Sequence, residues 1–265
     1  MPDLDRLLGG GLQSGELIEL VGKPIAGKTQ LCFLFCAAIL EAYSEPTVLF
    51  LDTCGNFSAS RILSYIKGKS GIACMKRVRC CLVPTVTDLL DALVQIRMGI
   101  AHSIGPLPTA KPNRQEETDR GFLNFCGNLK LIVVDSMTLP FLSLMSVLPS
   151  LARSELSLVA VELQRLTRVL RQTVVVTNHS RATPLHADLS SDKWNESHPS
   201  CTIIGCLGAN WACIPQKRLI CTPSANEHCT TPDGFCVSVT LSKDVGGPCF
   251  CEYGKINVKS CKVLL

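Results

Sequence analysis

Charged residues are scarce in this sequence of 265 residues, where they make up only 18%, against 46% apolar residues. A disordered chain shows the opposite balance, so we expect most of this chain to be folded. The formal net charge of +4 is also small. It permits binding to nucleic acid but does not by itself argue for it. The length suits one large α/β domain or two small ones.

Segments that would direct the chain to or across a membrane are also missing. The N-terminus, MPDLDRLLGG, has no apolar stretch after a basic start, which a signal peptide requires. No run reaches the roughly 18 uninterrupted apolar residues of a membrane-spanning helix. We therefore expect an intracellular protein without membrane association, whose sixteen cysteines are reduced.

The cysteines give little indication of a zinc site, which usually takes ligands in pairs with two to four residues between them. Cys32 and Cys36 have three residues between them, and Cys201 and Cys206 have four, which is the upper limit for such a pair. Several cysteines lie instead inside predicted elements, including Cys32 and Cys36 on a helix and a vicinal pair at 80–81 on a strand. There we expect them to be small buried hydrophobes.

Short apolar strands alternate with helices along the chain. Strands are predicted over 17–21, 47–51, 78–83, 131–134, 173–177, 217–221, 235–241 and 249–253, and helices over 29–43, 59–67, 85–98 and 155–172. Mixed charges, prolines and scattered apolar residues predict loops over 99–130 and 180–200. The pattern indicates an α/β fold with a mostly parallel, twisted sheet and helices on both faces. Ligands of such sheets bind beyond the carboxyl ends of the strands.

Residues 22–29, GKPIAGKT, match a phosphate-binding loop (P-loop) in full, between a predicted strand and a predicted helix. Its glycines let backbone N–H groups face phosphate oxygens, and the helix N-terminus adds partial positive charge. Lys28 is expected to reach the β- and γ-phosphates, and the Thr29 hydroxyl to bind Mg²⁺. We predict ATP and Mg²⁺ as cofactors, bound by Gly22, Lys23, Pro24, Ile25, Ala26, Gly27, Lys28, Thr29 and Gln30.

A second acidic position follows the apolar run LIVVD, which ends at Asp135. A carboxylate at a strand end, about a hundred residues after the P-loop, fits the magnesium-associated group of such sites. A turn or helix cap is the alternative. We predict Thr29 and Asp135 as metal ligands, and Lys28 and Asp135 as the catalytic pair.

These motifs resemble those of the RecA-type recombinases, most of all the eukaryotic recombinase paralogues of the D type. The matching segments are 4–12 (LDRLLGGGL), 14–16 (SGE), 27–31 (GKTQL), 50–53 (FLDT), 133–136 (VVDS) and 174–179 (VVVTNH). The resemblance implies one RecA-like ATPase domain over 1–265, with 200–265 as its C-terminal strands. It also implies a nuclear, DNA-dependent ATPase that binds single-stranded DNA in a complex of related subunits during homologous-recombination repair.

Two positions depart from that family. Active members carry a glutamate that orients the attacking water two residues beyond the Asp of the second strand, where this chain has Cys54. A thiol is a poor acceptor and mostly protonated at neutral pH, so we expect slow hydrolysis. His179 stands where strand-exchange members carry a glutamine that senses the γ-phosphate. It is a candidate sensor, or alternatively a capping residue.

The resemblance also implies that the loops after the strands ending at Asp135 and His179 face DNA. The first, 137–153, holds one basic residue, whereas the second offers Arg181, Lys193 and Trp194 for phosphate contacts and base stacking. The family usually has a small helical domain and a linker before the core. Because this chain begins almost at the core, we expect a short form or a fragment.

Two other functions remain open. A small-molecule kinase uses the same P-loop but needs an arginine-rich lid, for which Arg165, Arg168 and Arg171 are candidates with the spacing of a solvated helix face. A non-hydrolysing module that bridges recombinase-like subunits is the second alternative. Ile25, where the family favours a small residue, and the missing glutamate both favour it.

Overall fold

The computed structural model describes residues 2–68, 71–104, 114–184, 201–223, 236–244 and 255–259. Within these ranges nine strands form a sheet in the order β3-β2-β4-β5-β1-β7-β8-β9, with β6 paired to β5. The strands are β1 (Leu17–Gly22), β2 (Thr47–Asp52), β3 (Val78–Leu82), β4 (Leu129–Asp135), β5 (Thr173–Pro184), β6 (Cys201–Gly205), β7 (Lys217–Pro223), β8 (Cys236–Asp244) and β9 (Lys255–Lys259). The six from β3 to β7 in that order are parallel, and the other three pair antiparallel. The predicted α/β class with a mostly parallel sheet is confirmed.

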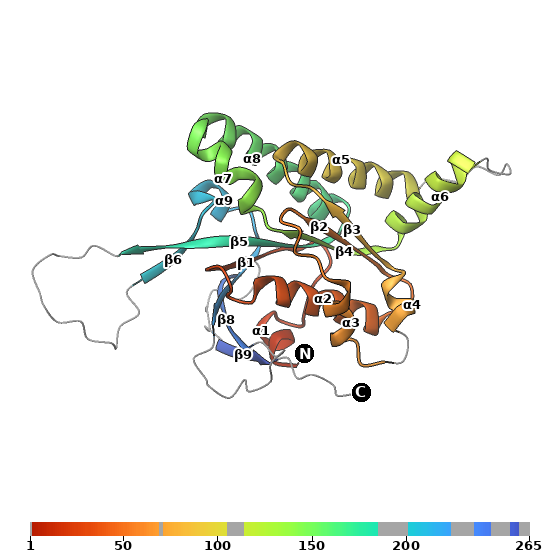
Figure 1. Cartoon of the computed structure of the whole chain (residues 1–265), viewed down its shortest axis with the longest axis horizontal. Coiled ribbons are helices and arrows are strands. Elements are labelled where there is room, and N and C mark those ends of the chain that lie inside the picture. Colours follow the sequence, from red (N-terminus) through yellow and green to blue (C-terminus); the bar gives the residue numbers. More distant parts are fainter. Residues whose placement is uncertain are drawn as a thin grey trace, which may run out of the picture.

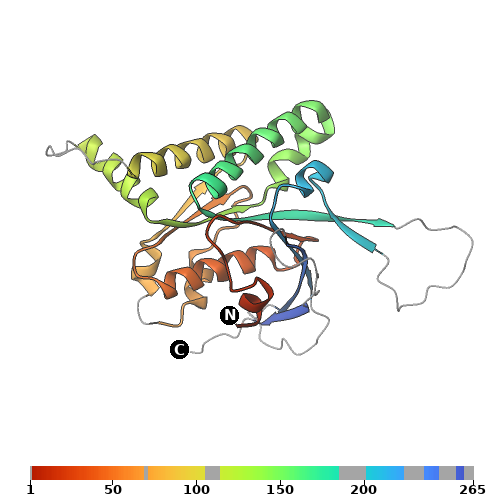
Figure 2. The same ribbon diagram turned by 180° about the vertical axis from the view of Figure 1, so that it is seen from behind.

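Helices cover both faces of the sheet (Figure 1). One face carries α1 (Pro2–Leu7), α2 (Lys28–Ala42), α3 (Ala59–Tyr65) and α4 (Gly71–Met75). The other carries α5 (Val86–Ser103), α6 (Arg114–Gly127), α7 (Thr138–Val147), α8 (Pro149–Gln164) and α9 (Gly208–Ala212). After α8 the chain continues as the short π-helix η1 (Arg165–Val169). Figure 2 shows the same layers from behind, with the ends of β5 and β6 extending beyond the rest of the sheet.

Two hydrophobic cores explain why the central strands are almost wholly apolar. Alternate residues of β4 face opposite layers, so that Leu131 and Val133 join the core around α2, while Ile132 and Val134 join the core around α5 and α8. A side chain at every position of such a strand is therefore removed from water. The same double burial explains α2, which is apolar nearly all round and packs against the sheet with Cys32 and Cys36 in its core.

Two sequence-based expectations are corrected by the structure. Most of the described part of 99–130 is helical rather than a loop, because α5 extends to Ser103 and α6 spans Arg114–Gly127, while residues 105–113 lie outside the described residues. The apolar residues of α6 are few, with Phe125 and Cys126 packed into the core, so the helical period is weak in the sequence. The cysteines at 80–81 are exposed rather than buried, because β3 is the last strand at one edge of the sheet.

Other predictions are only partly covered. Residues 180–184, expected in a loop, belong to β5, whereas 185–200 and the strand predicted over 249–253 lie outside the described residues. The ten cysteines whose side chains the structure describes are free thiols, and no cluster of three or more metal-ligating side chains occurs among the described residues. No described helix has both the length and the apolar character needed to cross a bilayer.

Candidate nucleotide-binding site

The P-loop connects the end of β1 to the start of α2, as its sequence predicts. Gly27 caps α2 with a φ of 81°, a left-handed conformation that glycine adopts without a steric penalty. Gly22 is enclosed, since a Cβ on it would lie 2.5 Å from the carbonyl oxygen of Cys221 on β7. Ile25 sits at the tip of the loop with a φ of 67° and is 99% exposed. The loop is therefore packed closely at its base and open at its tip.

The Lys28 side chain lies within the loop and is only 7% exposed. Its ammonium group donates to the carbonyl oxygens of Gly22 and Lys23, at 2.8 Å each. Burial lowers the pKa of Lys28, although the neighbouring Cys221 and Asp135 oppose that shift. An ammonium has three N–H donors, so two bonds to loop carbonyls leave one for a ligand.

Asp135 lies at the end of β4, opposite the start of α2, and is 3% exposed. Its Oδ2 accepts a hydrogen bond from the Thr29 hydroxyl at 2.7 Å, and its Oδ1 accepts one from Thr177 on β5. Burial raises the pKa of Asp135, against the effect of these two hydrogen bonds. A hydroxyl and a carboxylate side by side are the oxygen ligands that Mg²⁺ prefers. The predicted pair Thr29 and Asp135 is thus brought together, in a form that fits the metal.

The turn after β2 holds Cys54 against this site. The Asp52 carboxylate accepts from the backbone N–H groups of Cys54, Gly55 and Phe57 at 2.8–3.0 Å, and so acts as a cap for the turn. The Cys54 thiol donates to the Asp135 carbonyl oxygen at 3.4 Å. Burial raises the pKa of Cys54, which keeps the thiol protonated at neutral pH. The position therefore supplies no base.

His179 lies beside the P-loop, because β5 pairs with β1 and places His179 opposite Gly22. Its backbone N–H donates to the Thr138 hydroxyl at 2.8 Å. Burial lowers the pKa of His179, as does the nearby Lys28 ammonium, while Asp135 opposes them. The half-buried ring is therefore neutral at neutral pH, with one N–H to donate.

The residues predicted to contact DNA are only partly described. Arg181 lies two residues after His179 on β5, where its backbone pairs with Ile204 of β6. Lys193 and Trp194 lie outside the described residues. The first expected DNA-facing loop, 137–153, is helical instead and forms α7 and the start of α8.

Sequence reasoning missed a buried polar network beneath the site. Glu19 of β1 is 0% exposed, and its carboxylate accepts hydrogen bonds from Asn178, Trp211 and Arg218. The available signal was the single acidic residue in the apolar run LIELVG, since a charge in a buried strand needs partners.

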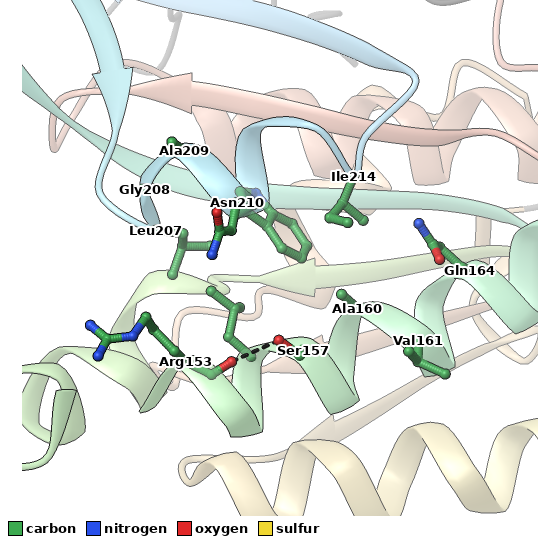
Figure 3. Close-up of a pocket in the computed structure, with 12 residues that line it drawn as sticks. Arg153, Ser157, Ala160, Val161, Gln164, Leu207, Gly208, Ala209, Asn210 and Ile214 are labelled. Carbon is green, nitrogen blue, oxygen red and sulfur yellow. Dashed lines mark hydrogen bonds between the residues drawn. The ribbon is translucent and has the colours of Figure 1, made fainter. Parts of the chain in front are cut away.

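A cleft of about 380 Å³ lies between α8 and α9. Figure 3 shows Arg153, Ser157, Ala160 and Gln164 along α8, facing Leu207, Asn210 and Ile214 across the opening. Trp211 of the buried network also lines this cleft. No P-loop residue contributes to it.

The fold and site together define a P-loop protein with a RecA-like α/β core. A profile of the Rad51 family matches residues 1–78. Two relatives match over 82% of the chain, namely "DNA repair protein RAD51 homolog 4" of Bos taurus at 27% identity and the protein of that name of Mus musculus at 29%. "DNA repair and recombination protein RadA" of Cenarchaeum symbiosum matches at 29% identity over 51% of the chain and 29% of its own length.

The N-terminal part of the chain thus resembles the Rad51 family, and over 82% of its length the chain is similar to the D-type paralogues of Bos taurus and Mus musculus. It matches 58% of the length of the Bos taurus relative and 57% of that of the Mus musculus relative.

Proposed function

We propose that this chain binds Mg-ATP, hydrolyses it slowly, and acts in the nucleus in homologous-recombination repair of DNA. The observation that carries the proposal is the arrangement of Lys28, Thr29 and Asp135 around the P-loop. Bound Mg²⁺ would neutralise phosphate charge and orient the γ-phosphate. Backbone N–H groups of residues 22–30 would hold the phosphates at the N-terminus of α2.

Each of the three side chains has a role in this proposal. Lys28 would exchange its loop carbonyl partners for the β- and γ-phosphates. The negative charge of the phosphates would compensate the buried ammonium, which has no carboxylate bonded to it among the described residues. Thr29 and Asp135 would hold the metal through the oxygens that now bond each other. Thr177 keeps the Asp135 carboxylate oriented from the opposite side.

Slow hydrolysis follows from the surroundings of Cys54. The protonated thiol donates to a backbone carbonyl, so it neither accepts a proton from water nor orients it for attack. Nucleotide would then act mainly as a switch that stabilises assembly with related subunits, since a ligand that binds one state favours that state. Rapid turnover is not required for this role.

The DNA part of the proposal is supported by the similarity to proteins of DNA repair and recombination. Arg181 follows the candidate sensor on β5, and Lys193 and Trp194 follow in the sequence. We propose that they contact single-stranded DNA through phosphates and stacking, within a complex of recombinase-like subunits.

Fluorescence anisotropy of a labelled single-stranded oligonucleotide tests the proposal. We expect the 265-residue chain with Mg-ATPγS to bind it at low salt, with an affinity that falls as salt rises. Arg181→Ala should weaken binding, whereas Arg168→Ala, at an exposed position of η1 before the amino end of β5, should not. Absence of binding at low salt would contradict the DNA-binding function.

A non-hydrolysing bridging module is the second candidate, favoured by the exposed Ile25 at the loop tip and by Cys54. It predicts no ATP turnover above background. The kinase alternative has no such support. Arg165 pairs with Glu162, and the three arginines expected in a lid, at 165, 168 and 171, precede the amino end of β5. The P-loop lies at the carboxyl end of the neighbouring parallel strand, at the opposite edge of the sheet.

A further inference from the structure

The three chain segments that carry the site are joined by buried polar contacts beneath it. Glu19 precedes the P-loop on β1, Thr138 follows Asp135 by three residues, and Asn178 immediately precedes His179 on β5. We propose that Glu19, Asn178 and Thr138 are positioning residues that hold His179 against the P-loop for recognition of the γ-phosphate. The inference rests on the proposed binding of ATP.

Glu19 anchors the network through both carboxylate oxygens. Oε1 accepts from Asn178 Nδ2 and Trp211 Nε1, each at 2.7 Å, and Oε2 accepts from Arg218 Nε at 2.6 Å. The donors come from β5, α9 and β7, so one carboxylate ties three elements to β1. Gly205 closes the space around Asn178, because a Cβ there would lie 2.4 Å from its Nδ2. The Asn178 amide therefore has little freedom to move.

The contacts from Asn178 to His179 have a fixed direction. Because Asn178 donates through Nδ2, its Oδ1 is the acceptor, and it takes the Thr138 hydroxyl proton at 2.8 Å. The Thr138 oxygen in turn accepts the backbone N–H of His179 at 2.8 Å. Thr138 is 1% exposed, so water does not replace either bond. Hydrogen bonds therefore connect Glu19 to the backbone of His179, the candidate sensor, without interruption.

Stability alone is a weak explanation for this network. A buried ion pair such as Glu19 with Arg218 carries a desolvation penalty, and apolar replacements of buried pairs are often as stable. A fully satisfied buried network does, however, specify one arrangement of the groups that it joins. Here the groups are the ends of the strands that carry the P-loop and His179, and the segment that follows Asp135. Fixing their separation is what discrimination between a triphosphate and a diphosphate requires.

Equilibrium titrations of the 265-residue chain with ATPγS and with ADP, both with Mg²⁺, test the inference. Thr138→Val keeps the shape of the side chain but removes the hydroxyl. We expect it to weaken ATPγS binding roughly fivefold, as for one buried hydrogen bond, and to change ADP affinity less than about twofold. Thr138→Ser retains the hydroxyl and should restore the preference for ATPγS.

Thr167→Val is the matched control, since the Thr167 hydroxyl is also buried but bonds the Leu163 carbonyl of its own helix at 3.0 Å. It should leave the ratio of the two affinities unchanged. If Thr138→Val left the ratio of the ATPγS and ADP affinities unchanged, whether or not both affinities fell, the positioning role would be overturned. Failure of the natural chain to bind either nucleotide would instead contradict the proposed function itself.

Discussion

At the scale of single residues, the candidate site consists of ionisable groups that the fold has removed from water. Lys28 and Asp135 are both buried, and burial shifts the pKa of each toward its neutral form. Such shifts concentrate at functional sites, which agrees with a role for both groups in holding phosphate and metal.

The first prediction concerns Cys54, which stands where active members of the family carry a glutamate. Cys54→Glu supplies a carboxylate beside Asp135 that can orient a water, and a positioned base contributes about 10²–10⁴-fold to rate. We expect steady-state ATPase turnover with single-stranded DNA to rise at least ~10-fold. Cys213→Glu, which adds the same charge at an exposed position of the chain, should have no effect. An unchanged rate in Cys54→Glu would refute this account of slow hydrolysis.

The second prediction follows from the raised pKa of Asp135. A carboxyl whose folded pKa lies above its unfolded value makes the folded state less stable once the pH rises through that window. Asp135→Asn should therefore unfold, without nucleotide, at a denaturant concentration no lower than the natural chain at pH 7. The difference in stability should narrow as the pH falls through the folded pKa of Asp135 toward its unfolded value. In the same variant, stabilisation by Mg-ADP should be lost, and retained stabilisation would contradict the metal role.

At the scale of secondary structure, the elements that position the candidate site were predictable, whereas α6 was not. β1, α2, β4 and β5 are long apolar runs because each is covered on both faces or all round. The length and the apolar pattern of these elements do not depend on which apolar residue stands at each position, so both can be recognised in the sequence. By contrast α6 has few buried side chains and leaves no clear apolar pattern. The edge strand β3 was predicted, but the exposure of its cysteines was not, because its place at the edge follows from the strand order.

The third prediction concerns the start of α5. Thr85 Oγ1 accepts from the Asp88 backbone N–H at 3.1 Å, and the Asp88 carboxylate accepts from the Thr85 N–H at 3.2 Å, which makes a reciprocal capping box. Thr85→Ala should lower the free energy of unfolding by about 1 kcal/mol in urea titrations. Ser58 caps the shorter α3 through a single hydrogen bond, from the Arg61 backbone N–H at 3.4 Å. Ser58→Ala should therefore lower the free energy of unfolding less. The reverse order would show that the box does not stabilise α5.

At the scale of the whole molecule, the sequence predicted the residues of the candidate nucleotide site but not the contacts that join its parts. The P-loop and Asp135 could be found because their residue types follow from phosphate and metal chemistry at fixed places in the chain. The Glu19 network could not, because Trp211 and Arg218 lie about two hundred residues further on and meet Glu19 only through the strand order. The same holds for the cleft between α8 and α9, which two distant segments form.

The central claim is that the P-loop of this chain holds Mg-nucleotide, and calorimetric titration with ATPγS in Mg²⁺ tests it most directly. The natural chain should bind one nucleotide per chain. Lys28→Ala should bind roughly 10–100-fold more weakly, since it loses a hydrogen bond to a charged group. Lys76→Ala, a change at an exposed lysine, should match the natural chain. Equal affinities in the natural chain and Lys28→Ala, or no binding by either, would contradict the claim.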